Sequence, residues 1–170
     1  MVRTTKNKTK SQDFFETPAW PTKILMEHEL FKGSIWEPAC GKGKMSKVIQ
    51  SYGYKVVSSD KIDRGFGSTK DFLETTKLKA DNIITNPPYN ILNEFMRHAL
   101  DLQPTKLALL IRTLSLETTP RYKLYQQFKP SKIIVLVNRV PFNGSEKPWG
   151  AWCLSWFIWS KKHTGPTELE

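Results

Sequence analysis

The chain has 170 residues, of which 39% are hydrophobic and 12% aromatic, a composition that favours one globular domain over a disordered chain. Its formal net charge of +10 favours a polyanionic partner, because lysine and arginine displace counterions from phosphates; a merely solubilising basic surface is the competing interpretation. Its two cysteines lack metal-ligand spacing, and no apolar leader or membrane span is evident, so we expect a soluble, cytoplasmic protein without a metal site.

Hydrophobic periodicity and breaker residues divide the chain into alternating elements. Residues 1–12 are basic and polar, and are predicted to form a mobile arm. This arm either contacts the phosphates of a nucleic acid or is simply a disordered terminus. Strands are expected at 34–36, 55–59, 82–85, 106–111, 132–137 and 151–159. Helices are expected over 21–33, 45–53, 91–99 and 121–128, loops over 61–70 and 140–150, and a frayed tail after residue 161.

Strands that alternate with helices in this way predict an α/β fold, a mostly parallel sheet with helices on both faces. The last two predicted strands are joined without a helix, so the last strand can pair antiparallel. In open sheets of this kind, ligands bind beyond the carboxyl ends of the strands. The segments that follow the strands therefore form the candidate site.

The first such segment carries two glycines, Gly41 and Gly43, which let the backbone turn sharply and approach a ligand closely. Asp60 closes the next predicted strand, where a carboxylate can accept hydrogen bonds from ribose hydroxyl groups. The turn differs from the dinucleotide pattern G-x-G-x-x-G. A plain turn cap is the competing interpretation of Asp60.

The second segment, Asn86-Pro87-Pro88-Tyr89, is more specific. Two consecutive prolines fix φ and remove two backbone donors, so the carbonyl oxygens there lack N–H competitors. The Asn86 side-chain oxygen and the Pro87 carbonyl could grip both hydrogens of an NH₂ group and direct its lone pair at an electrophile. Tyr89 adds a stacking face worth about 1–3 kcal/mol per base. A rigid turn in which Asn86 caps the next helix is the alternative.

Together, these segments resemble the adenine-N6 DNA methyltransferase family in which the cofactor motifs precede the catalytic motif. Residues 37–43 resemble its motif I, 86–89 its motif IV, and 14–18 its motif X, which helps to hold the methionine part of the cofactor. Asp60 matches the acid of motif II, and Asp71-Phe72 resembles motif III. Residues 139–142 lie where the family has an aromatic residue that clasps the target base.

The resemblance implies a Rossmann-like methyltransferase fold and S-adenosylmethionine as cofactor. The cofactor-binding residues that it implies are Thr17, Pro18, Glu37, Pro38, Ala39, Cys40, Gly41, Gly43, Asp60, Asp71, Phe72 and Asn86. The catalytic and base-holding residues that it implies are Asn86, Pro87, Pro88, Tyr89 and Phe142. The target adenine would be flipped out of its stack, and transfer would need no strong general base.

The implied catalytic domain is residues 13–162, followed by the tail 163–170, with no separate target-recognition domain. Sequence choice would then come from the loops 61–70, 112–120 and 140–150, or from a partner, or be weak. DNA is the expected partner, and we expect no membrane contact; a dimer or a specificity partner stays open. RNA base-amine methylation and a non-catalytic nucleic-acid-binding module with the same fold are the alternatives.

Overall fold

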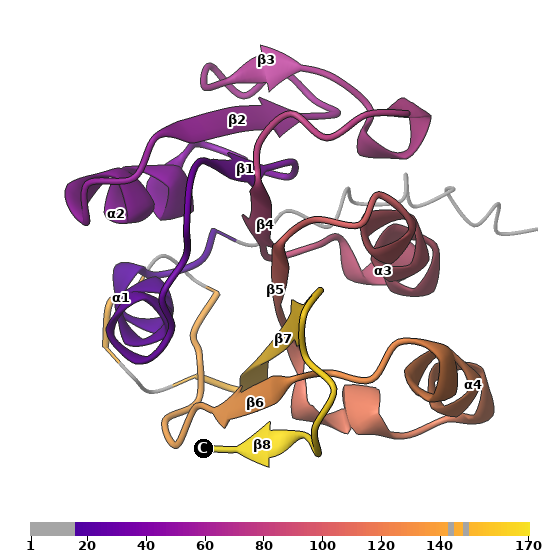
Figure 1. Cartoon of the computed structure of the whole chain (residues 1–170). Coiled ribbons are helices and arrows are strands. Elements are labelled where there is room, and N and C mark those ends of the chain that lie inside the picture. Colours follow the sequence, from indigo (N-terminus) through magenta and orange to yellow (C-terminus); the bar gives the residue numbers. More distant parts are fainter. Residues whose placement is uncertain (1–15, 143–144, 148–149) are drawn as a thin grey trace, which may run out of the picture.

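The computed structural model describes residues 16–142, 145–147 and 150–170, so the predicted basic arm lies outside the described residues (Figure 1). The strands are β1 (Ile35–Glu37), β2 (Val56–Asp60), β3 (Ser68–Thr69), β4 (Asn82–Thr85), β5 (Lys106–Arg112), β6 (Lys132–Val135), β7 (Leu154–Ser160) and β8 (Glu168–Leu169). The α-helices are α1 (Ala19–His28), α2 (Lys44–Ser51), α3 (Leu92–Asp101) and α4 (Thr119–Gln127), and the 3-10 helices are η1 (Phe72–Glu74), η2 (Tyr89–Ile91) and η3 (Thr113–Leu116). Among these described helices, none is both long enough and apolar enough to cross a membrane.

The described strands form one eight-stranded sheet in the order β3-β2-β1-β4-β5-β7-β6-β8. The pairings from β3 across to β5 are parallel, whereas β7 is antiparallel to both of its neighbours, β5 and β6. The predicted α/β fold, with a mostly parallel sheet and an antiparallel strand after β6, is thus confirmed. Because β1, β2, β4 and β5 run the same way, the segments that follow them meet at one edge of the sheet.

Helices cover both faces of the sheet, α1 and α2 on one and α3 and α4 on the other (Figure 1). Successive side chains of a strand point to opposite faces, and β5 shows the result clearly. Ala108 and Leu110 pack toward α1 and α2, whereas Leu107, Leu109 and Ile111 pack toward α3 and α4. All five are buried, which is why the strand is apolar throughout rather than alternating.

Several predicted elements differ in detail from the structure, and the loop after β2 and the first helix differ most. The loop predicted over 61–70 contains β3, which pairs with the end of β2. Helix α1 ends at His28 and not at Gly33, because Glu29 is already extended. A two-residue strand shows no hydrophobic period, so the sequence pattern could not indicate β3.

The prediction of a frayed tail is also wrong. Strand β8 pairs in parallel with β6 and covers its outer edge. The side chain of Lys132 lies within 3.7 Å of Glu168 and within 3.4 Å of both Glu29 and Glu170. The polar composition that is typical of a frayed terminus instead supplies ion pairs and an edge strand.

Candidate active site

A pocket of about 450 Å³ lies at the carboxyl-terminal edge of the parallel strands, where the segments after β1, β2 and β4 meet. This volume lies in the range of small-molecule and cofactor sites. Residues ahead of α1 and in η1 contribute to its walls. The predicted cofactor-binding residues that line it are Thr17, Glu37, Pro38, Ala39, Cys40, Gly41, Asp60, Asp71, Phe72 and Asn86. Pro87, Pro88 and Tyr89 line it too, so the two predicted segments share one pocket.

The turn between β1 and α2 depends on Gly41 and Gly43, whose φ angles of 53° and 79° lie in the left-handed region. A Cβ atom at Gly43 would collide with the ring of Phe66, so a side chain does not fit there. Gly43 is the N-cap of α2 and does not line the pocket, whereas Gly41 does. Gly43 therefore shapes the turn, and Gly41 brings the backbone to the pocket wall.

Asp60 joins this turn to the end of β2. Its Oδ2 accepts a hydrogen bond of 2.8 Å from the Gly41 N–H, and its Oδ1 accepts one of 3.0 Å from the Ile62 N–H. A carboxylate has about four lone-pair positions, so both oxygens can accept a further bond from a ligand. Asp60 is thus a turn cap and also a pocket acceptor, and the two interpretations of the sequence are compatible.

The side chain of Glu37, at the end of β1, is 2% exposed and accepts a hydrogen bond from the Ser46 hydroxyl. Burial raises the pKa of Glu37 to about 8, and the nearby Asp60 charge acts in the same direction. Burial also raises the pKa of the Cys40 thiol to about 12, so the thiol and not the thiolate is the favoured form at neutral pH. The pocket thus contains a buried carboxyl group that keeps its proton to a higher pH than an exposed glutamate does.

Asn86, directly after β4, is anchored through one end of its amide. Its Nδ2 donates a 3.0 Å hydrogen bond to Oγ1 of the buried Thr17, whereas its buried Oδ1 has no partner among the described residues. The following helices have Pro88 and Ile91 as N-caps, with no side-chain cap bond. Asn86 is therefore a pocket-lining acceptor and not the helix cap of the competing interpretation.

Tyr89 packs within an aromatic group that the sequence prediction contained only in part. Its ring is parallel to that of Trp152, with an interplanar angle of 1° and centroids 6.1 Å apart. The Arg112 guanidinium lies 3.6 Å from the Trp152 ring centroid and 5.8 Å from that of Tyr89. Burial raises the pKa of the Tyr89 hydroxyl, so it stays neutral near pH 7. Tyr89 thus belongs to a stack that continues away from the pocket.

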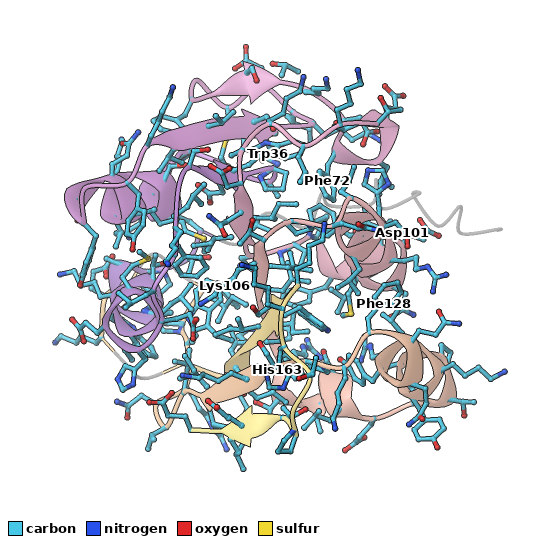
Figure 2. The ribbon with its side chains drawn as sticks, viewed as in Figure 1. Trp36, Phe72, Asp101, Lys106, Phe128 and His163 are labelled. Atoms are coloured by element: carbon cyan, nitrogen blue, oxygen red, sulfur yellow. The ribbon has the colours of Figure 1, made fainter. Side chains whose placement is uncertain are left out.

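Asp71 and Phe72 have structural contacts in addition to lining the pocket. Asp71 accepts a hydrogen bond of 3.0 Å from the Leu73 N–H and pairs with Lys61 at 2.7 Å, which lowers the pKa of its carboxyl group. Phe72 is buried, and its ring meets that of Trp36 edge-on at 5.2 Å (Figure 2). Phe72 therefore forms part of the apolar wall beneath the pocket.

Three predicted site residues do not line the pocket: Pro18, Gly43 and Phe142. Pro18 is the N-cap of α1, and Phe142 contacts the edge of Trp152 with ring centroids 6.1 Å apart. The sequence prediction named Arg112 only as the start of the loop 112–120 and did not name Trp152 as a site residue. Both become neighbours of Tyr89 through tertiary structure, in which Arg112 pairs with Leu154, two residues after Trp152. Within the described part of the chain, no cluster of His, Cys, Asp and Glu side chains could hold a metal ion.

Several solved structures with a similar fold are methyltransferases. A proposed RNA methyltransferase from Pyrococcus horikoshii superposes with a TM-score of 0.65 at 13% identity, over 88% of this chain and 85% of that one. The fold is the Rossmann-like methyltransferase fold. No protein-family model matches the chain. No curated protein matches it either.

Two further solved structures are similar to this chain, with lower TM-scores. The methyltransferase subunit of a type I restriction-modification system from Streptococcus thermophilus has a TM-score of 0.60 and 14% identity, over 88% of this chain and 45% of that subunit. The present chain thus spans less than half of that subunit's length. Magnesium protoporphyrin IX methyltransferase from Synechocystis, crystallised with S-adenosylhomocysteine, has a TM-score of 0.56 and 14% identity, over 82% of this chain and 78% of that one. At sequence identities this low, the similarity is one of fold alone.

Proposed function

We propose that this protein is an S-adenosylmethionine-dependent methyltransferase that acts on the exocyclic amine of a nucleic-acid base, with N6 of adenine in DNA as the substrate. The observation that carries the proposal is the Asn86 side chain. Its Oδ1 is a buried acceptor without a partner among the described residues, in a diproline turn that lines the pocket. A buried unsatisfied acceptor costs about 1–3 kcal/mol, so a donor from a ligand would stabilise this arrangement.

The residues of the pocket fit S-adenosylmethionine. Asp60 keeps acceptor capacity for ribose hydroxyl groups, and Phe72 offers an apolar wall for an adenine ring. Glu37 is a buried carboxyl group that a cationic ligand would favour in its ionised form. When bound, this cofactor supplies an electrophilic methyl group on a sulfonium ion.

The remaining residues would orient the substrate amine. Asn86 Oδ1 and the Pro87 carbonyl oxygen can each accept one of its hydrogens, and Thr17 holds the Asn86 amide so that Oδ1 and not Nδ2 stays available. Tyr89 would stack against the base. No general base is required for this reaction, because the amine nitrogen loses its proton only after it has become cationic. The Cys40 thiol, which is protonated near neutral pH, is therefore not needed as a base.

Nucleic acid as substrate is favoured by the net charge of +10 and by the Asn-Pro-Pro-Tyr turn. A base must leave its stack to reach such a pocket. The similar structures include a restriction-modification subunit and a proposed RNA methyltransferase, and the test therefore compares DNA with RNA.

The test is incorporation of a labelled methyl group into mixed-sequence DNA and RNA of equal length, followed by mapping of the modified bases. We expect label on adenine N6 in DNA. Label in RNA alone would keep the chemistry and replace the substrate. Binding of S-adenosylhomocysteine without transfer to either polymer would overturn the proposal in favour of a non-catalytic nucleic-acid-binding module.

A further inference from the structure

A second pocket, of about 470 Å³, shares Tyr89 and Asn90 with the first pocket. It lies between the start of α3, the end of β5, η3 and the start of α4. The residues that line it are Tyr89, Asn90, Leu92, Arg112, Leu114, Ser115, Glu117, Thr118 and Arg121. Of these residues, the catalytic function proposed above uses only Tyr89.

The polar lining of the second pocket carries a positive balance. Arg112 and Arg121 contribute two guanidinium groups against the single carboxylate of Glu117. The Arg112 guanidinium lies against the Trp152 ring, and a stacked guanidinium keeps N–H donors around its edge. Arg121 Nε donates a 3.3 Å hydrogen bond to Asn93 Oδ1, which leaves its two terminal NH₂ groups as further donors. Such planar donor groups suit the oxygens of a phosphate.

Ser115 gives an independent indication of a ligand. The residue is 1% exposed, and its Oγ has no hydrogen-bond partner among the described residues. Its backbone carbonyl, in contrast, accepts a 2.9 Å bond from the Tyr125 hydroxyl, so the position of the residue is fixed by other contacts. A buried hydroxyl that lines a pocket without a partner is a group that an acceptor oxygen would satisfy.

The start of α4 adds a third element. Its N-cap residue, Thr118, has a φ of 85°, which is unusual for a residue other than glycine, and makes no side-chain cap bond. The first N–H groups of a helix have no intrahelical acceptor, and their partial positive charge attracts anions. In α4 these are the N–H groups of Thr119 and Arg121, because Pro120 has none.

We propose that this second pocket binds a phosphate group of the nucleic-acid strand, next to the nucleotide whose base enters the first pocket. The inference rests on the proposed function for the identity of the strand. The two pockets share Tyr89 and Asn90. These two residues would therefore lie between the site of the base and the site of the phosphate. The strand would thus be held on either side of the diproline turn.

The test uses the full chain and a short single-stranded oligonucleotide with one adenine among thymines, because an unpaired base needs no extraction from a duplex. Arg121→Gln removes one guanidinium, and Lys123→Gln is the matched control, since Lys123 is exposed on the same helix outside the pocket. We expect Arg121→Gln to weaken oligonucleotide binding roughly tenfold, as for loss of a charged hydrogen bond. The slope of log affinity against log salt should fall by roughly 0.7 to 1, and Lys123→Gln should change both quantities less.

A neutral methylphosphonate placed at each position of the oligonucleotide locates the contact. We expect it to weaken binding to the unmodified protein beside the adenine, and to have little further effect at that position on Arg121→Gln. Ser115→Ala should show the same non-additivity if it folds, which thermal unfolding checks. Equal effects of Arg121→Gln and Lys123→Gln, or additivity at every position, would overturn the phosphate site. Inorganic phosphate that binds without weakening oligonucleotide binding would overturn it too.

Methyl transfer and methylphosphonate effects report on the activity and on the phosphate site separately. Methyl transfer by the unmodified chain, together with additive methylphosphonate effects, would leave the methyltransferase and remove the phosphate site. Non-additive effects without any methyl transfer would leave a nucleic-acid-binding pocket and remove the activity. Affinity for S-adenosylhomocysteine should be the same in Arg121→Gln and in the unmodified chain, because Arg121 does not line the first pocket.

Discussion

Asn86 presents two chemically different atoms to its surroundings, and only one of them is satisfied. Nδ2 donates to Thr17 Oγ1, whereas Oδ1 has no partner among the described residues. The bond to Thr17 therefore decides which end of the amide is available to a ligand. Since Thr17 precedes α1 and Asn86 follows β4, this orientation depends on tertiary structure and not on the diproline turn alone.

Replacement of Asn86 by alanine should separate substrate orientation from cofactor binding. We expect the kcat of Asn86→Ala for DNA methylation to fall at least about 100-fold, because the amine would lose its alignment. Its affinity for S-adenosylhomocysteine, measured by calorimetry, should change little. Asn138→Ala is the matched control, since Asn138 is exposed and lines neither pocket. A parallel loss of turnover and cofactor affinity would contradict the role given to Asn86.

Glu37 should make both stability and cofactor affinity depend on pH. Burial raises its pKa in the folded protein to about 8, from an ordinary value of 4.5. Between these values the folded state retains a proton that the unfolded state has lost, so the free energy of unfolding falls as pH rises, by at most about 1.4 kcal/mol per pH unit. A cationic ligand favours the ionised carboxylate, and therefore affinity for S-adenosylmethionine should rise over the same interval.

Glu37→Gln is the matching test, because it keeps the size of the side chain and cannot ionise. Denaturant unfolding should be followed from about pH 5 to about pH 8, the interval between the ordinary and the raised pKa of Glu37. The free energy of unfolding should depend less steeply on pH for Glu37→Gln than for the unmodified chain. Cofactor affinity of the variant should be weaker and nearly independent of pH. Identical pH profiles of the two proteins would show that Glu37 does not carry this proton.

At the scale of elements, apolar segments that end at a turn could be predicted from the sequence, whereas two-residue polar strands could not. The strand predicted over 82–85 has the bounds of β4, because an apolar run there ends at a diproline turn. Strands β3 and β8 each have two residues and no period. The antiparallel register that brings Trp152 and Arg112 beside Tyr89 is equally absent from local sequence. The residues of the first pocket follow largely from motifs. For the second pocket the sequence indicated only the loop 112–120, whose position beside Tyr89, Asn90 and Arg121 depends on tertiary structure.

Strand β8 should contribute to stability through its cover of β6 more than through its ion pairs. Its backbone pairs with β6, and the Val135 N–H donates a 2.8 Å hydrogen bond to the Glu170 carbonyl. Deletion of residues 165–170 should lower the free energy of unfolding by roughly 1–3 kcal/mol, in line with the net contribution of several hydrogen bonds. It should also promote aggregation, because β6 becomes an exposed edge.

The control for this deletion is Glu170→Gln, which keeps the strand and removes the carboxylate near Lys132. Exposed ion pairs contribute about 0–1 kcal/mol, so thermal unfolding of this variant should resemble that of the unmodified chain. Light scattering at the midpoint temperature reports the aggregation. If Glu170→Gln were as destabilised as the deletion, the ion pairs and not the strand would account for the stability of the tail.

Across the whole molecule, both pockets open at the end of the sheet where β1, β4 and β5 finish, so one strand of nucleic acid could reach both. The net charge of +10 would attract such a strand from a distance, whereas the two pockets would fix its position. Long-range attraction depends on total charge, and docking depends on particular contacts. Removal of charge outside the pockets therefore tests the first contribution separately.

Residues 1–12 contain Arg3, Lys6, Lys8 and Lys10 and no acidic residue, so their deletion lowers the net charge from +10 to +6. If this segment contacts phosphates, the log–log salt slope of DNA binding should fall by up to about 3 to 4, at roughly 0.7 to 0.9 for each phosphate that the segment neutralises. Affinity for S-adenosylhomocysteine should not change, because the described residues that line the first pocket all follow this segment in the chain. Fluorescence anisotropy over a salt series measures the slope. An unchanged slope would mean that the four cations do not contact DNA, and that the arm contributes only to the solubility of the chain.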